Sequence, residues 1–178
     1  MATREEGLNG APPDGRVVKM LLKQLKEFAG AHPNLSAALL DDGESRVWVV
    51  RISGCDAPHD GEFFFKLIVP NEFPHKPPRF RFITPNGVFL TGMWICISVG
   101  EYHAGDKPGA TGSHGWRPAL GMKGFALEAL NGFMNFDGEI HGIGIAIKPR
   151  AERAALAAAS RDWNRRHAAE VVARFAMD

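Results

Sequence analysis

A cysteine flanked by alternating apolar residues is the first feature of this sequence that could carry chemistry. In residues 93–99 (MWICISV), an extended backbone would point two isoleucines and a valine to one side and Cys96 with Ser98 to the other. The apolar side chains would anchor the segment and present the thiol, which as a thiolate is a nucleophile suited to acyl transfer. A buried, inert cysteine is the alternative, because unpaired cysteines are commonly buried.

The second cysteine and the histidines offer weaker chemistry. Cys55 lies in the turn sequence SGCD without apolar anchors, so we expect an incidental or structural role. The chain has 7 His and 2 Cys but neither a CxxC pair nor a closely spaced histidine pair. A structural zinc site needs about four ligands, so we expect no metal and no other cofactor. A cysteine hydrolase built from Cys96 with His103, His114 or His141 remains an alternative.

The spacing of apolar residues predicts the elements that must position these groups. Asp14 is a suitable N-cap, and the apolar residues after it recur at helical spacing up to Gly30 and Pro33. Alternating patterns separated by Asp, Gly and Pro then predict four strands in an antiparallel meander. The expected strands span 35–40, 46–52, 62–69 and 79–83.

Helices should cover this sheet, because phenylalanines alternate with arginines along 79–83 and leave one face apolar. Helical spacing returns over 120–136, and an alanine-rich region over 150–177 predicts one or two more helices. Between them, residues 84–115 show little periodicity, and a loop of that length is where chemistry is expected. We expect 100–115 to be a mobile flap beside the cysteine; its glycines match no phosphate-binding motif.

Length and composition limit the remaining possibilities. With 178 residues, 45% hydrophobic and 23% charged, the chain should form one domain, not a fibrous or disordered protein. A net charge of +1 gives no electrostatic footprint for nucleic acid. We find no signal sequence and no apolar run long enough for a membrane span. We therefore expect a flexible extension over 1–13, a folded domain over 14–178 and, from the few cysteines, a cytoplasmic location.

Four short motifs occur in order after the predicted helix and strands. They are Phe73-Pro74-His75-Lys76-Pro77-Pro78, Thr84-Pro85-Asn86-Gly87, Ile95-Cys96-Ile97-Ser98 and Trp116-Arg117-Pro118-Ala119-Leu120. In this order they resemble the ubiquitin-conjugating enzymes, from about Asp14 to Phe175. The resemblance implies an α+β fold: an N-terminal helix, a four-stranded antiparallel meander, an active-site loop, a crossover helix and C-terminal helices. Residues 14–178 would be the catalytic domain.

The resemblance also implies a reaction at Cys96. Enzymes of this family accept ubiquitin from an activating enzyme as a thioester on the cysteine. They then pass it to a lysine amine, usually with a ubiquitin ligase bound. Asn86 matches the asparagine of the family's His-Pro-Asn motif, which supports the loop or donates its amide to a developing oxyanion. Both roles stay open, and Thr84 stands where the motif has histidine.

Two departures from the common pattern are similar to particular members. The Thr-x-Asn-Gly sequence, set further from the cysteine than usual, resembles the tail-anchored enzymes of the endoplasmic reticulum membrane. If the chain has lost a C-terminal anchor, we expect it at that membrane surface. The long stretch after Cys96 resembles the loop of the acidic-loop enzymes. If the flap over 100–115 shapes the path of the acceptor lysine, Glu101 and Asp106 would orient its ammonium group, and His103 would either take its proton or be a solvated loop residue.

Partner-binding residues also follow from the resemblance. Family members bind activating enzymes and ligases through the first helix, the proline-rich loop and the loop after the tryptophan. Here these sites correspond to Lys19, Lys23, Lys26, His75, Arg117, Pro118 and Ala119. The three lysines could equally form a solvated helix face. The main rival to an enzyme is a non-catalytic ubiquitin-binding variant of the same fold, which would lack the nucleophile that this chain has.

Overall fold

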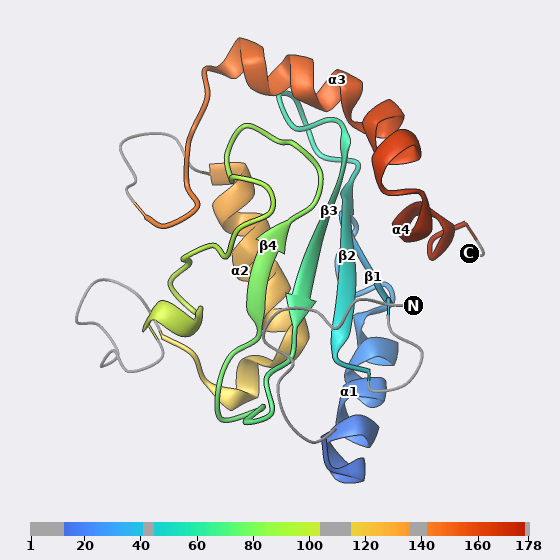
Figure 1. Ribbon diagram of the computed structural model, residues 1–178, viewed down its shortest axis with the longest axis vertical. Helices are drawn as coiled ribbons and strands as arrows, with labels where there is room; N and C mark the ends of the chain where they lie inside the picture. Colours follow the sequence, from blue (N-terminus) through green and yellow to red (C-terminus); the bar gives the residue numbers. More distant parts are fainter. Residues whose placement is uncertain (1–12, 41–44, 104–114, 136–141, 177–178) are drawn as a thin grey trace.

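A small sheet and the helices around it form the fold. The computed structural model describes residues 13–40, 45–103, 115–135 and 142–176 (Figure 1). Its elements are α1 (Gly15–Phe28), β1 (Leu35–Leu39), β2 (Val47–Ser53), β3 (Glu62–Ile68), β4 (Arg79–Phe82), η1 (Glu101–His103), η2 (Pro118–Leu120), α2 (Gly121–Asn135), α3 (Arg150–His167) and α4 (Ala169–Ala173). Most of the expected N-terminal extension and of the expected flap lies outside the described residues. No helix within those ranges has the length and apolar character needed to cross a bilayer.

The sheet is the predicted four-stranded meander. Its strands pair in the order β1-β2-β3-β4, each antiparallel to its neighbour (Figure 1). The register places Trp48 opposite Leu67, and Leu67 opposite Phe80, on one face of the sheet. Because side chains alternate along a strand, this face is almost wholly apolar. The predicted α+β class and the strand positions are confirmed, with bounds that differ by a residue at most ends.

The first helix forms where the sequence predicts it. The carboxylate of Asp14 accepts a hydrogen bond from the backbone N–H of Arg16 at 2.9 Å, which caps α1. Leu21 and Phe28 are buried against the sheet, while the other side of the helix is exposed. Gly30, at φ 70°, then turns the chain into β1.

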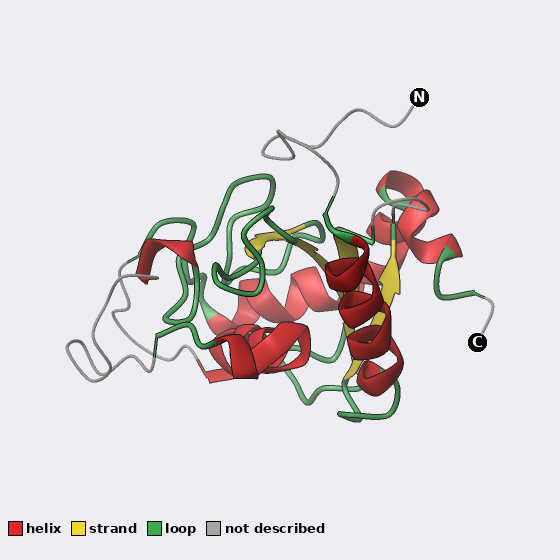
Figure 2. Cartoon of the chain, turned by 90° about the horizontal axis from the view of Figure 1, so that it is seen from below, coloured by secondary structure: helices red, strands yellow, loops and turns green. Residues whose placement is uncertain are grey.

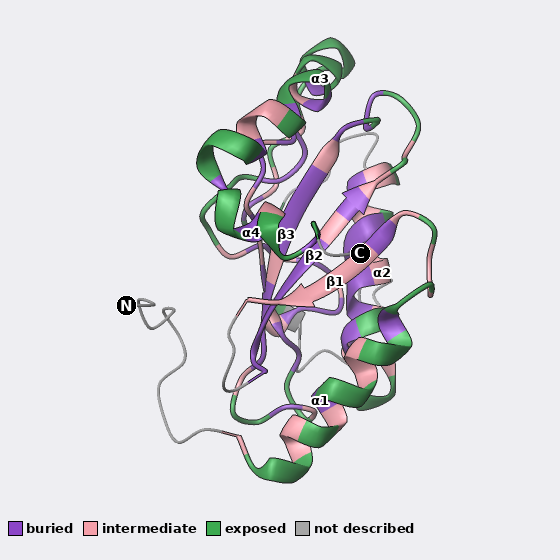
Figure 3. Ribbon diagram, turned by 90° about the vertical axis from the view of Figure 1, so that its right-hand side faces the viewer, coloured by how far each residue is buried: buried purple, intermediate pink, exposed green. Residues whose placement is uncertain are grey.

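The second long helix covers the apolar face of the sheet. α2 follows η2, so the predicted helix start at 120 is a short 3₁₀ turn beginning at Pro118. Phe125 of α2 packs edge-on against Phe80, and Phe133 packs against Phe63. Burial of each such side chain contributes about 1.5–3 kcal/mol. Figure 3 shows this interior of buried strands and helix faces, with exposed outer faces on α1 and α3.

The C-terminal region forms two helices, one of the two outcomes expected for 150–177. The backbone departs from helical geometry at Ala168, where α3 ends and α4 begins. α4 lies on the other face of the sheet, where Val171 and Phe175 pack on Val49 and Phe64. Figure 2 shows α4 and the C-terminus on the opposite side of the molecule from η1. Helices therefore cover both faces of the sheet, and η1 lies on the side of the molecule away from α4.

Candidate active site

Cys96 lies in an irregular segment that runs beside β4 and turns after Ile97. The backbone N–H of Ile95 donates to the carbonyl of Phe80 at 2.9 Å. Ile95, Ile97 and Val99 are buried, whereas Cys96 and Ser98 are partly exposed. The alternation of buried and partly exposed residues expected from the sequence is therefore present, although the chain turns at 98–99, and Cys96 is partly exposed on an anchored backbone. Both cysteines are free of disulfides.

A second segment, 142–148, forms backbone hydrogen bonds both with Cys96 and with residues 87–90. The N–H of Cys96 donates to the carbonyl of Ile143 at 2.8 Å. The N–H of Leu90 donates to the carbonyl of Gly144 at 2.8 Å, and the N–H of Ala146 to that of Val88 at 2.9 Å. The 142–148 segment thus joins the turn after Asn86 to the cysteine. Sequence reasoning did not foresee it, because it forms no regular strand of its own.

Asn86 holds the turn that precedes this pairing. Its side chain is 1% exposed. Its amide nitrogen donates to the carbonyls of Thr84 at 3.0 Å and Phe89 at 3.1 Å. Its amide oxygen accepts the N–H groups of Val88 at 2.9 Å and Phe89 at 2.8 Å. Both amide hydrogens are therefore engaged within residues 84–89, which favours the supporting role over the oxyanion role.

Thr84 occupies a fully buried position in the same turn. Its hydroxyl accepts the N–H of Phe64 in β3 at 2.9 Å and donates to Oδ1 of Asn164 in α3 at 2.7 Å. Residues 84–89, which we call the Asn86 turn, are therefore tied to both the sheet and α3. Sequence reasoning missed Asn164. Its signal was available, since Ser160 and Asn164 are polar residues at helical spacing on the buried stripe of an alanine-rich helix.

Three large apolar side chains are exposed in the segments that meet at Cys96. They are Leu90, Met93 and Ile143, which are 44%, 39% and 49% exposed. Leu90 and Ile143 belong to the two segments joined by the backbone pairing described above. Exposed apolar residues gathered at one place commonly mark a binding surface. These exposed apolar residues are therefore candidates for contact with a bound chain.

The residues suggested for the acceptor-lysine path are only partly described. Glu101 lies at the start of η1. Its two carboxylate oxygens accept the Nε–H of Arg79 at 2.9 and 3.1 Å. The same guanidinium lies 4.4 Å from the ring centre of Trp94. Glu101 thus faces a cation already present in the fold. His103 belongs to η1, and Asp106 lies outside the described residues.

The residues suggested for partner binding are all exposed and lie on connected elements. They are Lys19, Lys23 and Lys26 of α1, His75, and Arg117, Pro118 and Ala119 before α2. Nε1 of Trp116 donates to the carbonyl of Pro74 at 2.9 Å, which joins the last two regions. The side-chain oxygen of Gln24 accepts the N–H of Met122 at 2.8 Å, which joins α1 to α2. The three regions therefore lie together at one end of the molecule, at the bottom of Figure 1.

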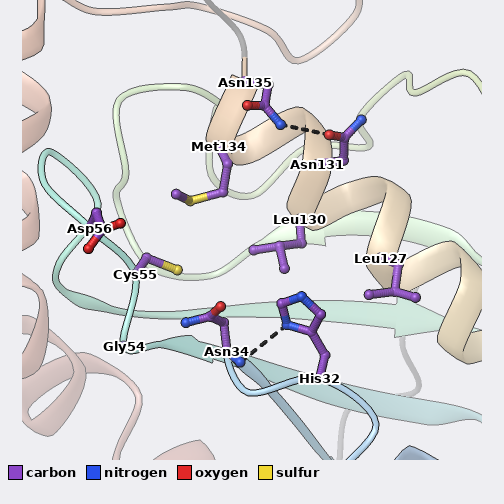
Figure 4. Close-up of a pocket in the computed structure, with 10 residues that line it drawn as sticks. All are labelled: His32, Asn34, Gly54, Cys55, Asp56, Leu127, Leu130, Asn131, Met134 and Asn135. Carbon is purple, nitrogen blue, oxygen red and sulfur yellow. Dashed lines mark hydrogen bonds between the residues drawn. The ribbon is translucent and has the colours of Figure 1, made fainter.

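Cys55 lies elsewhere, at a small cavity of about 300 Å³ between the turn after β2 and the end of α2. Figure 4 shows its sulfur facing Leu130 and Met134, with Asp56 beside it. Burial, and secondarily the negative charge of Asp56, raise the pKa of the Cys55 thiol above its usual range. A raised pKa keeps the thiol protonated at neutral pH, which agrees with an incidental or structural role.

The hydrolase alternative depends on a histidine near Cys96, and a metal site depends on a cluster of ligand side chains. His114 and His141, two of the three histidines considered as a hydrolase base, lie outside the described residues. Among the residues that the structure describes, no three His, Cys, Asp or Glu side chains gather as metal ligands would.

Known proteins resemble this chain in sequence. No family model matches it. A ubiquitin-conjugating enzyme E2 6 of Candida glabrata is 31% identical over 149 residues, covering 82% of this chain and 55% of the relative. The human ubiquitin-conjugating enzyme E2 J1 is 32% identical over 148 residues, covering 82% of this chain and 43% of the relative. The chain thus spans about half the length of these curated relatives.

Solved structures give the same result for the fold. Human ubiquitin-conjugating enzyme E2 G1 is 24% identical with a TM-score of 0.56, covering 71% of this chain and 99% of that one. The E2 domain of a ubiquitin-conjugating enzyme of Toxoplasma gondii is 19% identical with a TM-score of 0.54, covering 83% of this chain and 96% of that one. At these identities the structures show a shared fold. The chain is therefore similar in sequence to ubiquitin-conjugating enzymes over 82% of its length, and it shares the fold of their solved structures.

Proposed function

We propose that this protein is a ubiquitin-conjugating transferase that carries ubiquitin as a thioester on Cys96. The observation that supports this most directly is the setting of Cys96: a partly exposed thiol on a segment whose alternate residues are buried. The 142–148 segment holds its backbone from the other side through the bond to Ile143. The thiol can therefore be reached by a partner while its backbone stays in place.

The reaction would proceed in two acyl transfers. The Cys96 thiolate attacks the carbonyl carbon of the thioester that joins ubiquitin to its activating enzyme, and the activating enzyme's thiolate leaves. A lysine amine then attacks the new thioester, an amide bond forms, and the Cys96 thiolate is released as the amine's extra proton passes to water. A thioester suits these two transfers because the thiolate is a good leaving group when an amine attacks the carbonyl carbon.

The other groups at the site would support this chemistry in defined ways. The exposed Leu90, Met93 and Ile143 would contact the chain attached to Cys96. Asn86 would hold the turn beside the thiol, since its amide groups are all bonded within that turn. Glu101, His103 and Asp106 remain a prediction for the path of the acceptor lysine.

Activating enzyme, ubiquitin and a ligase are the partners that this function requires. The exposed residues on α1, near His75 and at Arg117 to Ala119 are the proposed binding surface for the activating enzyme and the ligase. A reducing, cytoplasmic setting belongs to the same proposal, because the thioester needs Cys96 as a free thiol.

The test is charging with activating enzyme, ATP and ubiquitin, followed by electrophoresis without reductant. Wild-type protein and Cys55→Ala should give an adduct that thiol removes. Cys96→Ser should give an oxygen ester that resists thiol but not alkali, because an alkoxide is a poorer leaving group. Cys96→Ala should give none. Failure of the wild type to form the adduct would support the non-catalytic variant, and cleavage of a ubiquitin ester would support the hydrolase.

A further inference from the structure

α3 contacts the sheet through two buried polar side chains at one end of β3. Ser160 Oγ accepts the N–H of Glu62 at 2.8 Å. Asn164 Nδ2 donates to the carbonyl of the same Glu62 at 2.9 Å. The side chain of Asn164 is 0% exposed, although the carbonyl of Glu62 that accepts its bond is only partly buried. Such bonds stabilise modestly when made, but leaving one partner alone in the interior is costly.

Asn164 differs from Ser160 in what else it contacts. Within the described part of the chain, Ser160 bonds to its own helix through the carbonyl of Ala157 and to β3 through the N–H of Glu62. Oδ1 of Asn164, in contrast, accepts the hydroxyl of Thr84 at 2.7 Å. Thr84 is the first residue of the Asn86 turn, and its carbonyl accepts the amide of Asn86. Asn164 is therefore connected to the candidate active site, and Ser160 is not connected in this way.

α3 touches the same turn at a second point. A Cβ placed on Gly87 would lie 3.0 Å from Cγ of Arg153 and 3.2 Å from Cδ1 of Leu156, both side chains of α3. Gly87 has φ 77°, in the region that favours glycine. Its carbonyl also accepts the N–H of Lys148, at the end of the 142–148 segment. The helix is thus packed directly on the turn that this segment joins to Cys96.

We infer that Thr84 and Asn164 are positioning residues, through which α3 holds the Asn86 turn in the geometry that the reaction at Cys96 needs. The connection runs from Asn164 to the Thr84 hydroxyl, from the Thr84 carbonyl to Asn86, and from Asn86 to the N–H groups of Val88 and Phe89. The 142–148 segment then joins this turn to Cys96. This inference rests on the proposed function for its catalytic consequence, but its structural part can be tested separately.

The variants are Thr84→Val, Thr84→Ser and Ser160→Ala. Thr84→Val keeps the shape of the side chain and removes the hydroxyl, whereas Thr84→Ser keeps the hydroxyl. Ser160→Ala is the matched control, because it removes one hydrogen bond between α3 and β3 without touching the Asn86 turn. If Thr84→Val does not fold, Asn164→Ala takes its place, since it leaves the bond from Phe64 to Thr84 intact.

Two measurements are made on each folded variant. The first is hydrogen exchange of the Val88 and Phe89 amides, which requires no ubiquitin. We expect Thr84→Val to exchange on the order of tenfold faster than wild type at these amides. The second is single-turnover discharge of the Cys96 thioester to free lysine, well below each melting temperature. It should slow by a similar factor, on the order of tenfold, while charging still goes to completion.

The comparison among variants decides the question. Recovery by Thr84→Ser, with Ser160→Ala close to wild type in both measurements, would support a positioning role. Equal effects of Thr84→Val and Ser160→Ala on exchange and discharge would overturn it and leave a purely structural contact. If the wild type forms no thioester, the proposed function fails, and the exchange measurement alone still decides whether α3 holds the turn.

Discussion

Asn86 and Phe89 bond to each other twice, side chain to backbone. The amide nitrogen of Asn86 donates to the carbonyl of Phe89 at 3.1 Å, and the N–H of Phe89 donates to the amide oxygen of Asn86 at 2.8 Å. The phenyl ring of Phe89 is itself buried and stacked on Phe82, with ring centres 5.2 Å apart. The Asn86 turn is therefore held in place by the amide side chain of Asn86 and by the buried ring of Phe89.

Asn86→Ala should lower the stability of the whole protein. The substitution removes the amide oxygen that accepts the buried N–H groups of Val88 and Phe89, and leaving a buried N–H unsatisfied costs about 1–3 kcal/mol. We expect a loss of roughly 3 kcal/mol in the free energy of unfolding, measured by urea denaturation, together with slower discharge of the Cys96 thioester. Asn135→Ala, which removes an exposed bond to Asn131, is the control and should change stability little. Slow discharge of Asn86→Ala at wild-type stability would instead favour an oxyanion role.

Cys55 should react slowly with alkylating reagents. Burial and the carboxylate of Asp56 raise its pKa, so at a given pH the folded protein holds less thiolate than the unfolded chain. The rate of reaction with iodoacetamide, followed from pH 7 to 10 in a Cys96→Ala background, should rise at a higher pH in the folded protein than in urea. The raised pKa also makes stability depend on pH. The contribution of the Cys55 thiol to the free energy of unfolding is present at neutral pH and is lost as the pH rises through the pKa of the folded state. Identical pH profiles in the folded and unfolded states would contradict the buried setting.

Gly61→Ala should disturb the contact between α3 and the start of β3. A Cβ at this position would lie 2.5 Å from Oγ of Ser160 and 2.7 Å from the carbonyl oxygen of Ala157, and the latter is rigid helix backbone. Overpacking of this kind costs about 1–3 kcal/mol, and we expect the melting temperature to fall accordingly. Gly15→Ala is the control, since nothing lies within 4 Å of its added methyl group. A Gly61→Ala protein as stable as Gly15→Ala would show that α3 can move away from the sheet freely.

Glu101→Gln should have little effect on either half-reaction. The carboxylate of Glu101 is already paired with Arg79, and a partly exposed ion pair contributes about 0.2–1 kcal/mol. We expect charging of Cys96 to be unchanged and discharge to lysine to stay within about twofold of wild type. A much larger fall in discharge, at an unchanged melting temperature, would show that Glu101 acts on the acceptor lysine more strongly than its pairing with Arg79 allows.

Local patterns in the sequence are enough to predict the helices, the strands and the partly exposed position of Cys96. Helical spacing after a capping Asp14 predicts α1, and alternating patterns predict the strands, because both periodicities follow from local backbone geometry. The same alternation places Ile95 and Ile97 inside and Cys96 outside, as observed. These are short-range properties, and the residues that decide them are neighbours in the chain.

The groups that support the Cys96 backbone come from parts of the chain that are far away in sequence. The partner of Cys96 in the backbone pairing, Ile143, is distant in sequence, and so is Asn164, the partner of Thr84. No local pattern encodes such pairings, because they arise only when segments that are far apart in the chain pack together: 142–148 beside Cys96, and α3 on the sheet. The open choice between the two roles of Asn86 has the same origin. Its type and place in the motif permit both, and only the positions of the surrounding carbonyl and N–H groups show that all of its donors are already engaged.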